Sequence, residues 1–192
     1  MRMFELFPQF ESWRAPWREK CLQPDISERE DRVRILANTN WEAVLERAIR
    51  EIHTLSAARS RVIPLSSPQY PLLLRLCPDR PIVLFLKGYW DILASLAITV
   101  VGSRKALRTE EDLAFRIAQC FATSNCLVVS GLNQGIEAAV QRGVLDCGRR
   151  GLVVVGNSLD KIYPAENKKL AFRILDQGGA WISEIPHSST SQ

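Results

Sequence analysis

The chain has 192 residues, of which 46% are hydrophobic and 24% charged, a composition typical of a water-soluble globular protein with a sizeable core. Its net charge of +4 allows a polyanionic partner but excludes a histone-like protein that binds through charge alone. No apolar run reaches the 18 residues of a membrane span and no signal-peptide pattern follows Met1, so we expect a cytoplasmic protein with no membrane partner.

The chain is predicted to divide into an N-terminal helical extension, residues 1–60, and an α/β domain, residues 61–192. A possible capping box at Thr39 and Glu42 opens a helix whose apolar residues share one face as far as Leu55. We expect that face to pack against the neighbouring domain or a partner subunit. Aromatic residues near the start either dock a partner or tether the extension to its own domain: Phe4, Phe7, Phe10, Trp13 and Trp17.

Residues 61–192 alternate apolar β-branched runs with amphipathic helical patterns. After a turn-rich linker and a short helix (65–71 and 72–76), strands are predicted at 82–88, 98–102, 127–130, 152–156 and 180–184. Three helices are predicted between the later strands: one capped by Thr109 and Asp112, one ended by Gly148, and one over 165–176. This alternation predicts βαβ crossovers and a Rossmann-like, doubly wound, mostly parallel sheet.

The cysteines are odd in number and contain no CxxC pair. A zinc site needs more closely spaced ligands, so we expect no metal and no cofactor. Most of the cysteines lie within apolar patterns, which predicts buried free thiols in a reducing compartment: Cys21, Cys77, Cys120, Cys126 and Cys147.

Two strands end in small turns rich in hydrogen-bond donors, Ile98-Thr-Val-Val-Gly-Ser-Arg104 and Leu127-Val-Val-Ser-Gly-Leu-Asn-Gln-Gly-Ile-Glu137. Parallel strands deliver such turns to one edge of the sheet, where backbone amides beside helix N-termini hold phosphates. The sequence therefore predicts a phosphate site there. Its expected ligands are Gly102, Ser103, Arg104 and Lys105 in the first segment, and Ser130, Gly131, Gln134 and Gly135 in the second.

Three side chains of this predicted site have competing interpretations, and a fourth has one expected role. Arg104 either forks two hydrogen bonds onto a phosphate or forms an ion pair with a carboxylate such as Glu184. Lys161 is either a second phosphate contact or a solvated lysine. Tyr163 either stacks on a base or packs beside the proline that follows it. Asn167 is expected to order its loop through side-chain hydrogen bonds.

Enzymatic chemistry finds little support among these residues. The first turn lacks the G-x-G-x-x-G pattern of dinucleotide-binding enzymes, and no Walker loop is present. Ser103 and Ser130 have no histidine partner, since His53 and His187 lie in unrelated segments. We expect a binding protein, with a nucleotide-binding sensor or a nucleotide-processing enzyme on the same fold as the alternatives.

Six motifs in matching order and spacing resemble the DNA-processing protein A (Smf) family, across residues 66–186. They are Gln69-Tyr-Pro-Leu-Leu-Leu, Pro81-Ile-Val-Leu-Phe-Leu-Lys-Gly, Val100-Val-Gly-Ser-Arg, Val129-Ser-Gly-Leu-x-x-Gly-Ile, Leu159-Asp-Lys-Ile-Tyr-Pro-Ala-Glu-Asn and Ser183-Glu-Ile-Pro. The resemblance implies an extended Rossmann-like domain that binds single-stranded DNA. It also implies loading of the RecA recombinase during natural transformation and DNA recombination, dimerisation, and no established catalysis.

This chain departs from the family pattern in the second segment. The family usually reads Ser-Gly-Leu-Ala-Arg-Gly-Ile-Asp, whereas Asn133, Gln134 and Glu137 stand here for its Ala, Arg and Asp, and Gln141 for a later His. Without the arginine, we expect weaker and less salt-dependent DNA binding. The family domain also continues with a further strand and an Arg-Asn-Arg segment, so this chain resembles a short, divergent member truncated at its C-terminus, whose sheet a partner chain could complete.

Overall fold

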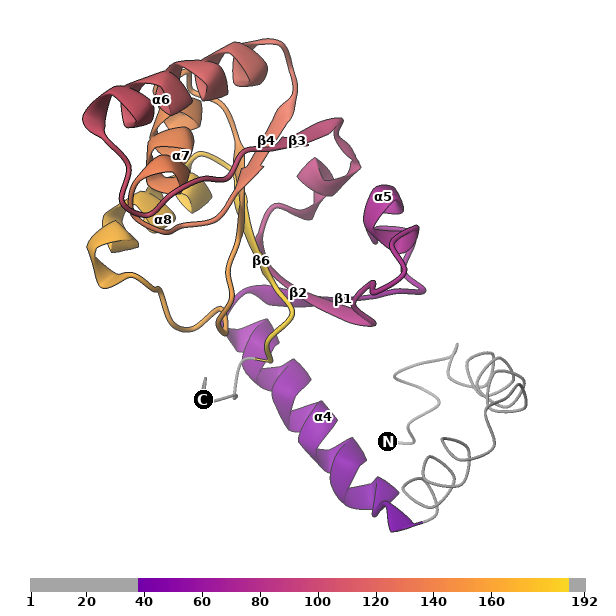
Figure 1. Ribbon diagram of the computed structural model, residues 1–192. Coiled ribbons are helices and arrows are strands. Elements are labelled where there is room, and N and C mark those ends of the chain that lie inside the picture. The colour runs from indigo at the N-terminus through magenta and orange to yellow at the C-terminus, as the bar shows by residue number, and fades with distance from the viewer. Residues whose placement is uncertain (1–37, 187–192) are drawn as a thin grey trace. The chain divides into compact units, whose positions relative to one another are not determined.

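The computed structural model describes residues 38–186 (Figure 1). By its contacts the chain divides into two units, residues 1–47 and 48–192. The aromatic residues of the predicted extension, Cys21 and His187 lie outside the described residues. Helix α4 (Trp41–Ala57) confirms the predicted helix. Its cap is Asn40, whose Oδ1 accepts a hydrogen bond from the Ala43 N–H at 3.1 Å, one residue beyond the predicted Thr39.

A six-stranded mixed sheet organises the second unit, in the spatial order β1-β2-β6-β5-β4-β3. Strands β3 to β6 run parallel to one another, β2 is antiparallel to β6, and β1 is antiparallel to β2. Five of the strands match the predicted ones. The strands are β1 (Ser60–Pro64), β2 (Val83–Gly88), β3 (Ala97–Thr99), β4 (Leu127–Ser130), β5 (Gly151–Val154) and β6 (Ala180–Ser183).

Strand β1 is the one that the sequence does not predict. It lies at the expected junction between extension and domain, and its register pairs Ser60 with Lys87 and Pro64 with Val83. The strand is short and ends at a proline, which is tolerated at a sheet edge because no neighbour there needs the missing N–H. Five residues show too little alternation to be recognised, so pairing with β2 decides their structure.

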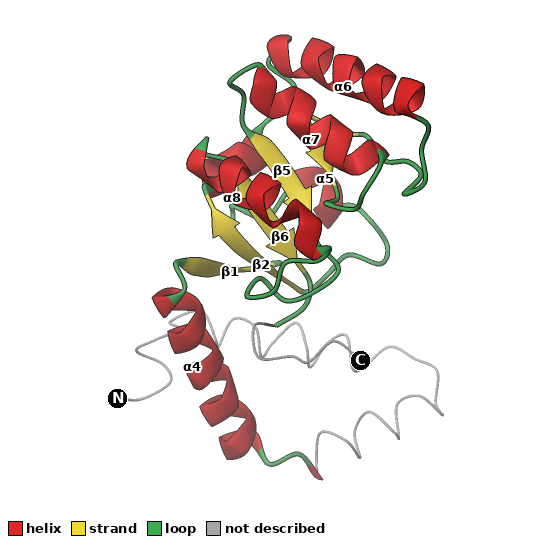
Figure 2. Cartoon of the chain, turned by 90° about the vertical axis from the view of Figure 1, so that its left-hand side faces the viewer, coloured by secondary structure: helices red, strands yellow, loops and turns green. Residues whose placement is uncertain are grey.

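Three long helices cover one face of the sheet: α6 (Arg108–Thr123), α7 (Ile136–Asp146) and α8 (Lys168–Asp176) (Figure 2). Because β3 to β6 lie side by side in chain order, each right-handed crossover places its helix on the same side. Of the helices in the described part of the chain, the short α5 (Leu72–Arg75) and the 3₁₀ helix η1 (Trp90–Ala94) lie on the other face. The Rossmann-like α/β class is confirmed, with a winding more one-sided than the doubly wound sheet expected.

Alternating side chains of the strands fill two separate cores. Val128 and Val153 point toward α6, α7 and α8, whereas their neighbours Leu127 and Leu152 point toward α5 and η1. Among the large groups on the first face, Trp181 donates its indole N–H to the Ala171 carbonyl at 3.1 Å. Both faces of the parallel strands are therefore apolar, as their continuous hydrophobic runs predict.

Two local predictions are corrected by the structure. Helix α6 is not capped by Thr109 and Asp112; instead the Glu110 carboxylate accepts a hydrogen bond from the Leu107 N–H at 2.8 Å. The predicted end of α7 is confirmed, because Gly148 adopts φ 65° just beyond it. The described cysteines are free, as expected, but none is fully buried: Cys77 and Cys120 are exposed, and Cys126 and Cys147 are partly exposed.

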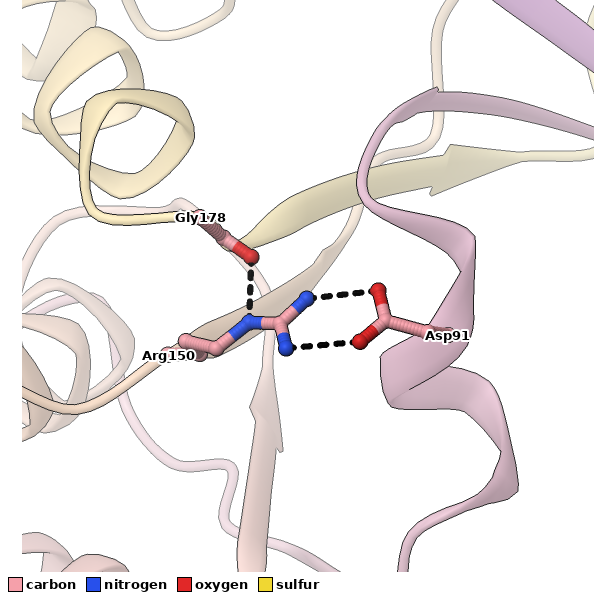
Figure 3. Close-up of polar contacts among 3 residues, drawn as sticks. All are labelled: Asp91, Arg150 and Gly178. Atoms are coloured by element: carbon pink, nitrogen blue, oxygen red, sulfur yellow. Dashed lines mark hydrogen bonds and ion pairs between the residues drawn. The ribbon is translucent and has the colours of Figure 1, made fainter.

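Arg150 joins three chain segments where the parallel strands begin (Figure 3). Its guanidinium donates to both carboxylate oxygens of Asp91 at 2.7 and 2.8 Å, and its Nε donates to the Gly178 carbonyl at 2.6 Å. Hydrogen bonding from Arg150 lowers the pKa of Asp91 below its ordinary value. Arg150 thus connects η1 to the starts of the strands that precede and follow α8.

Among the described residues, no helix is long and apolar enough to cross a membrane.

Candidate nucleic-acid interface

Three loops meet at the carboxyl edge of the parallel strands. We call them the first edge loop (100–107, after β3), the second edge loop (131–135, after β4) and the third edge loop (155–164, after β5). All of the predicted site residues lie in these loops or directly beside them. The carboxyl edge of an open parallel sheet is where ligands bind in this fold class.

Hydrogen bonds between the loops fix their relative positions. The Ser130 hydroxyl donates to the Val100 carbonyl at 2.7 Å, and the Ile136 N–H donates to the Ser103 carbonyl at 3.2 Å. Ser130 is 1% exposed, so its hydroxyl joins two strand ends and does not face solvent. The site thus owes its shape to bonds that the sequence pattern alone does not reveal.

The 3₁₀ helix η2 (Ala165–Asn167) links the third loop to the second. The buried Asn167 side chain donates to the Leu132 carbonyl at 2.7 Å. It therefore orders the second edge loop as well as its own, and its amide lies away from solvent. The ordering role expected for Asn167 agrees with this geometry, whereas contact with a ligand is not favoured.

The glycines of the first and second edge loops allow the loops to touch each other. A Cβ on Gly102 would lie 2.7 Å from the Ile136 side chain. Gly135 has φ 75°, and a Cβ there would lie 2.4 Å from the Ser103 carbonyl oxygen. Each glycine thus has an internal packing reason to be glycine. Close approach of a phosphate is not needed to explain either position.

The second edge loop is occupied by a carboxylate of the protein itself. Glu137, in the first turn of α7, accepts hydrogen bonds on Oε2 from the Asn133 N–H at 2.9 Å and from the Asn133 side-chain amide at 2.8 Å. A Cβ on Gly131 would lie only 2.2 Å from the same oxygen, so glycine leaves the room that the carboxylate fills. Sequence reasoning missed this contact, although an acidic residue in the first helical turn is the signal for it.

Exposed cations lie on the first and third edge loops. Arg104, Lys105 and Lys161 are all exposed, and the side chain of none of them forms a hydrogen bond or ion pair with another described residue. In particular, Arg104 is not paired with Glu184, which was the competing interpretation. Gln134 is also exposed, at the tip of the second loop. The free positive charge of the edge is therefore concentrated on the two outer loops.

Polar contacts hold the third edge loop in shape. The Asn157 side-chain amide donates to the Ser158 and Lys161 carbonyls at 2.8 and 2.5 Å, and the Ser183 hydroxyl donates to the Asn157 carbonyl at 2.7 Å. Neither Asn157 nor Ser183 was predicted as a site residue. Tyr163, in the same loop, is 68% exposed, so its ring does not pack into the core beside the buried Pro164.

The described residues include no group of three His, Cys, Asp or Glu side chains that could hold a metal ion. What the edge offers is two adjacent exposed cations on the first loop, a lysine on the third, and an exposed aromatic ring. An arginine binds phosphate oxygens in a forked geometry, and an exposed ring stacks on any base. Fold and edge together define a Rossmann-like α/β protein, a class in which ligands bind at the carboxyl ends of the parallel strands.

Comparison with known proteins identifies the family. The family model described as DNA recombination-mediator protein A matches residues 61–192, and the chain belongs to this family. It is 33% identical over 132 residues to Protein Smf of Escherichia coli, covering 69% of this chain and 35% of that protein. It is 35% identical over 101 residues to DNA processing protein DprA of Streptococcus pneumoniae, covering 53% of this chain and 36% of that protein.

Two solved structures share the fold. The X-ray structure of DprA from S. pneumoniae gives a TM-score of 0.63 at 25% identity, over 88% of this chain and 59% of that chain. DNA processing protein A from Helicobacter pylori, studied for its single-stranded DNA binding mode, gives 0.61 at 22% identity, over 70% and 59%. The chain spans about a third of the length of the two curated relatives and more than half of each solved chain.

Proposed function

We propose that the carboxyl edge binds single-stranded DNA without chemistry of its own. The observation that carries this proposal is Arg104: it lies in the loop that follows β3, it is exposed, and no described residue neutralises it. Membership of a recombination-mediator family supports a DNA ligand. The polar groups around Arg104 form hydrogen bonds with one another, whereas the Arg104 guanidinium has no partner among the described residues. It is therefore available to bind a phosphate.

The proposed contacts are made partly to the phosphates of the DNA and partly to its bases. Arg104 and Lys105 bind one phosphate, the Ser103 hydroxyl donates to it, and Lys161 binds another. Ser103 Oγ already accepts a hydrogen bond from the Lys105 N–H at 3.0 Å, which leaves its proton free to donate. Tyr163 stacks on a base, and this favours a single strand, because bases of a duplex are stacked on one another.

The size of the affinity follows from the number of charges. With Gln134 where the family usually has arginine, the second edge loop adds a hydrogen bond at most and releases no counterion. We therefore expect the logarithm of the affinity to fall with the logarithm of the salt concentration with a slope of about −2, set by about three cations on a single strand.

The role in the cell is proposed from the family. A recombination mediator passes single-stranded DNA to a recombinase, and we propose that this chain does so for RecA, in the cytoplasm, during DNA uptake. Binding through side chains at an open edge leaves the strand accessible to a second protein. The chain covers 35% of E. coli Smf, so recognition of RecA is assigned to this chain only as a proposal.

A homodimer is also proposed, through the edge strand β3. The run from Leu96 to Val101 carries no charge, and these two residues are 78% and 65% exposed. Two copies can meet there without like-charge repulsion. The outer side of β3 has unpaired backbone N–H and C=O groups, which readily pair with a strand of another chain. Light scattering tests this: we expect twice the 21.7 kDa chain mass, reduced to one chain by Leu96→Lys. A wild-type monomer at high concentration contradicts it.

The DNA proposal is tested by titrating fluorescently labelled oligo-dT and measuring its anisotropy at several salt concentrations. We expect Arg104→Ala to weaken binding by about tenfold, the effect of one charge-assisted phosphate contact. Arg173→Ala removes an equally exposed arginine from the last turn of α8 and serves as the matched control. Absence of binding at low salt, or equal binding by Arg104→Ala and wild type, overturns the proposal.

A further inference from the structure

The carboxylate of Glu137 lies where a phosphate would bind at the start of α7. Phosphates bind helix N-termini because the first turn offers unpaired N–H groups and a positive dipole end. We propose that Glu137 acts as an internal phosphate substitute that closes the second edge loop to DNA phosphates. In this way it directs the strand to the first and third loops. The assignment rests on the DNA-binding function proposed above, which it makes more specific.

The geometry matches that of a bound anion. Glu137 Oε2 accepts one backbone and one side-chain hydrogen bond from Asn133, at 2.9 and 2.8 Å. The same oxygen lies over Gly131, at 2.2 Å from the position that a Cβ there would occupy. Backbone N–H, side-chain amide and glycine thus surround a carboxylate in the manner in which such loops surround a phosphate.

The remaining donors at this helix start are largely used as well. The Ile136 N–H donates to the Ser103 carbonyl at 3.2 Å. The Ala138 and Ala139 N–H groups donate to the carbonyls of Asn133 and Gly135 at 3.1 and 3.0 Å. A phosphate arriving at the second edge loop would have to displace Glu137 to gain the Asn133 N–H.

Charge separates the loops in the same way. The first edge loop carries Arg104 and Lys105, neither of which is paired with another described residue, whereas the second loop and its helical turn carry Glu137 and the neutral Gln134. A phosphate is therefore attracted on one side of the contact between the loops and repelled on the other. At separations of about 8 Å in water, one such charge changes an affinity about two- to threefold at low salt, and less as salt screens it.

The first test asks where an anion binds, without DNA. Inorganic phosphate is titrated into the wild-type protein while backbone amide signals are followed by NMR. We expect the amides of residues 103–105 to shift and those of residues 131–135 to stay unchanged. A phosphate-dependent shift of the Asn133 amide in the wild type overturns the proposal, and this readout needs no variant to fold.

The second test changes the charge alone. Glu137→Gln keeps an oxygen that accepts the Asn133 N–H and removes the negative charge, so oligo-dT binding should tighten about two- to threefold at low salt and not at high salt. Asp146→Asn makes the same charge change in the last turn of α7, about 15 Å along the helix, and should have no such effect.

Equal tightening by both variants, or none by Glu137→Gln, overturns the assignment to Glu137. Failure of the DNA proposal looks different, because the wild-type protein then does not bind oligo-dT at all, or Arg104→Ala binds as tightly as wild type. In that case the phosphate titration still decides whether Glu137 closes the second loop.

Discussion

The first and second edge loops begin in nearly the same way and end in opposite states. Each follows an apolar parallel strand, contains a Ser-Gly or Gly-Ser step and leads into a helix. In the first loop, Arg104 and Lys105 face solvent, and neither side chain has a partner among residues 38–186. In the second, the Asn133 N–H donates a hydrogen bond to the Glu137 carboxylate, and Gly131 leaves the space that this carboxylate occupies. A small-residue turn at a strand end therefore marks a place where an anion fits, and the anion can belong to the protein itself.

Separating the two loops should have the largest effect. Gly135→Ala introduces a Cβ 2.4 Å from the Ser103 carbonyl oxygen at a residue with φ 75°, so we expect unfolding free energy to fall by about 3 kcal/mol in urea denaturation. Gly148→Ala shares the positive φ but has open space around its Cβ, and should cost about 1 kcal/mol. Equal losses would mean that contact between the loops contributes nothing.

Removing the aromatic ring tests whether the third edge loop works with the first. Tyr163→Leu should weaken oligo-dT binding about fivefold, the lower part of the range for one stacked base, whereas Tyr163→Phe keeps the ring and the affinity. Anisotropy titration of both variants measures this. If Phe and Leu weaken binding alike, the hydroxyl and not stacking is responsible.

Adding a cation to the second edge loop should reduce the difference in positive charge between the first and second edge loops. Gln134 is exposed, so Gln134→Arg should tighten oligo-dT binding about threefold and steepen the salt dependence by up to one phosphate contact. Ser124→Arg, just beyond the C-terminal end of α6, adds the same charge at the opposite end of the strands. Similar gains from both variants would assign the effect to net charge.

The smallest effect is expected at the strand starts, away from all three loops. Because Asp91 has a lowered pKa in the folded protein, its pair with Arg150 stabilises above the unfolded pKa of about 3.8, and this contribution is lost as pH falls through the folded pKa. Asp91→Asn should lower stability by about 0.5 kcal/mol at pH 7, since both groups are partly exposed, and not at pH 2.

Thermal unfolding at the two pH values checks the Asp91 prediction, with Asp79→Asn as an exposed control. Oligo-dT affinity should be unchanged by Asp91→Asn, because the ion pair lies where the parallel strands begin, at the opposite end from the proposed DNA site. A loss of affinity would contradict the division between the two edges of the sheet.

Local patterns predicted the strands and the position of the edge, because buried parallel strands are continuous apolar runs bounded by turns. They did not predict β1, whose structure depends on pairing with a strand twenty residues away. The placement of α6, α7 and α8 on one face of the sheet was also not predicted, since it depends on the order of the strands in the sheet, which no single segment of the sequence determines.

At the proposed site, the sequence did not predict the partners of the polar groups. Arg104, Lys105 and Lys161 are exposed, so their contact with a ligand stays a prediction that the geometry allows. Ser130 and Asn167 turn inward, toward Val100 and Leu132, because each meets a carbonyl from a distant segment. Such pairs, 30 and 35 residues apart, follow from the fold and cannot be found from spacing.

The hydrogen bonds between the loops affect the entropic cost of binding the proposed DNA ligand. Fixing a backbone residue in one conformation costs roughly 1–2 kcal/mol of conformational entropy. Ser130, Ile136 and Asn167 impose that order when the sheet folds, before any ligand arrives. In the proposed complex the backbone of these loops is already ordered, so the entropic cost of binding falls on the DNA strand and on the exposed side chains of Arg104, Lys105 and Lys161.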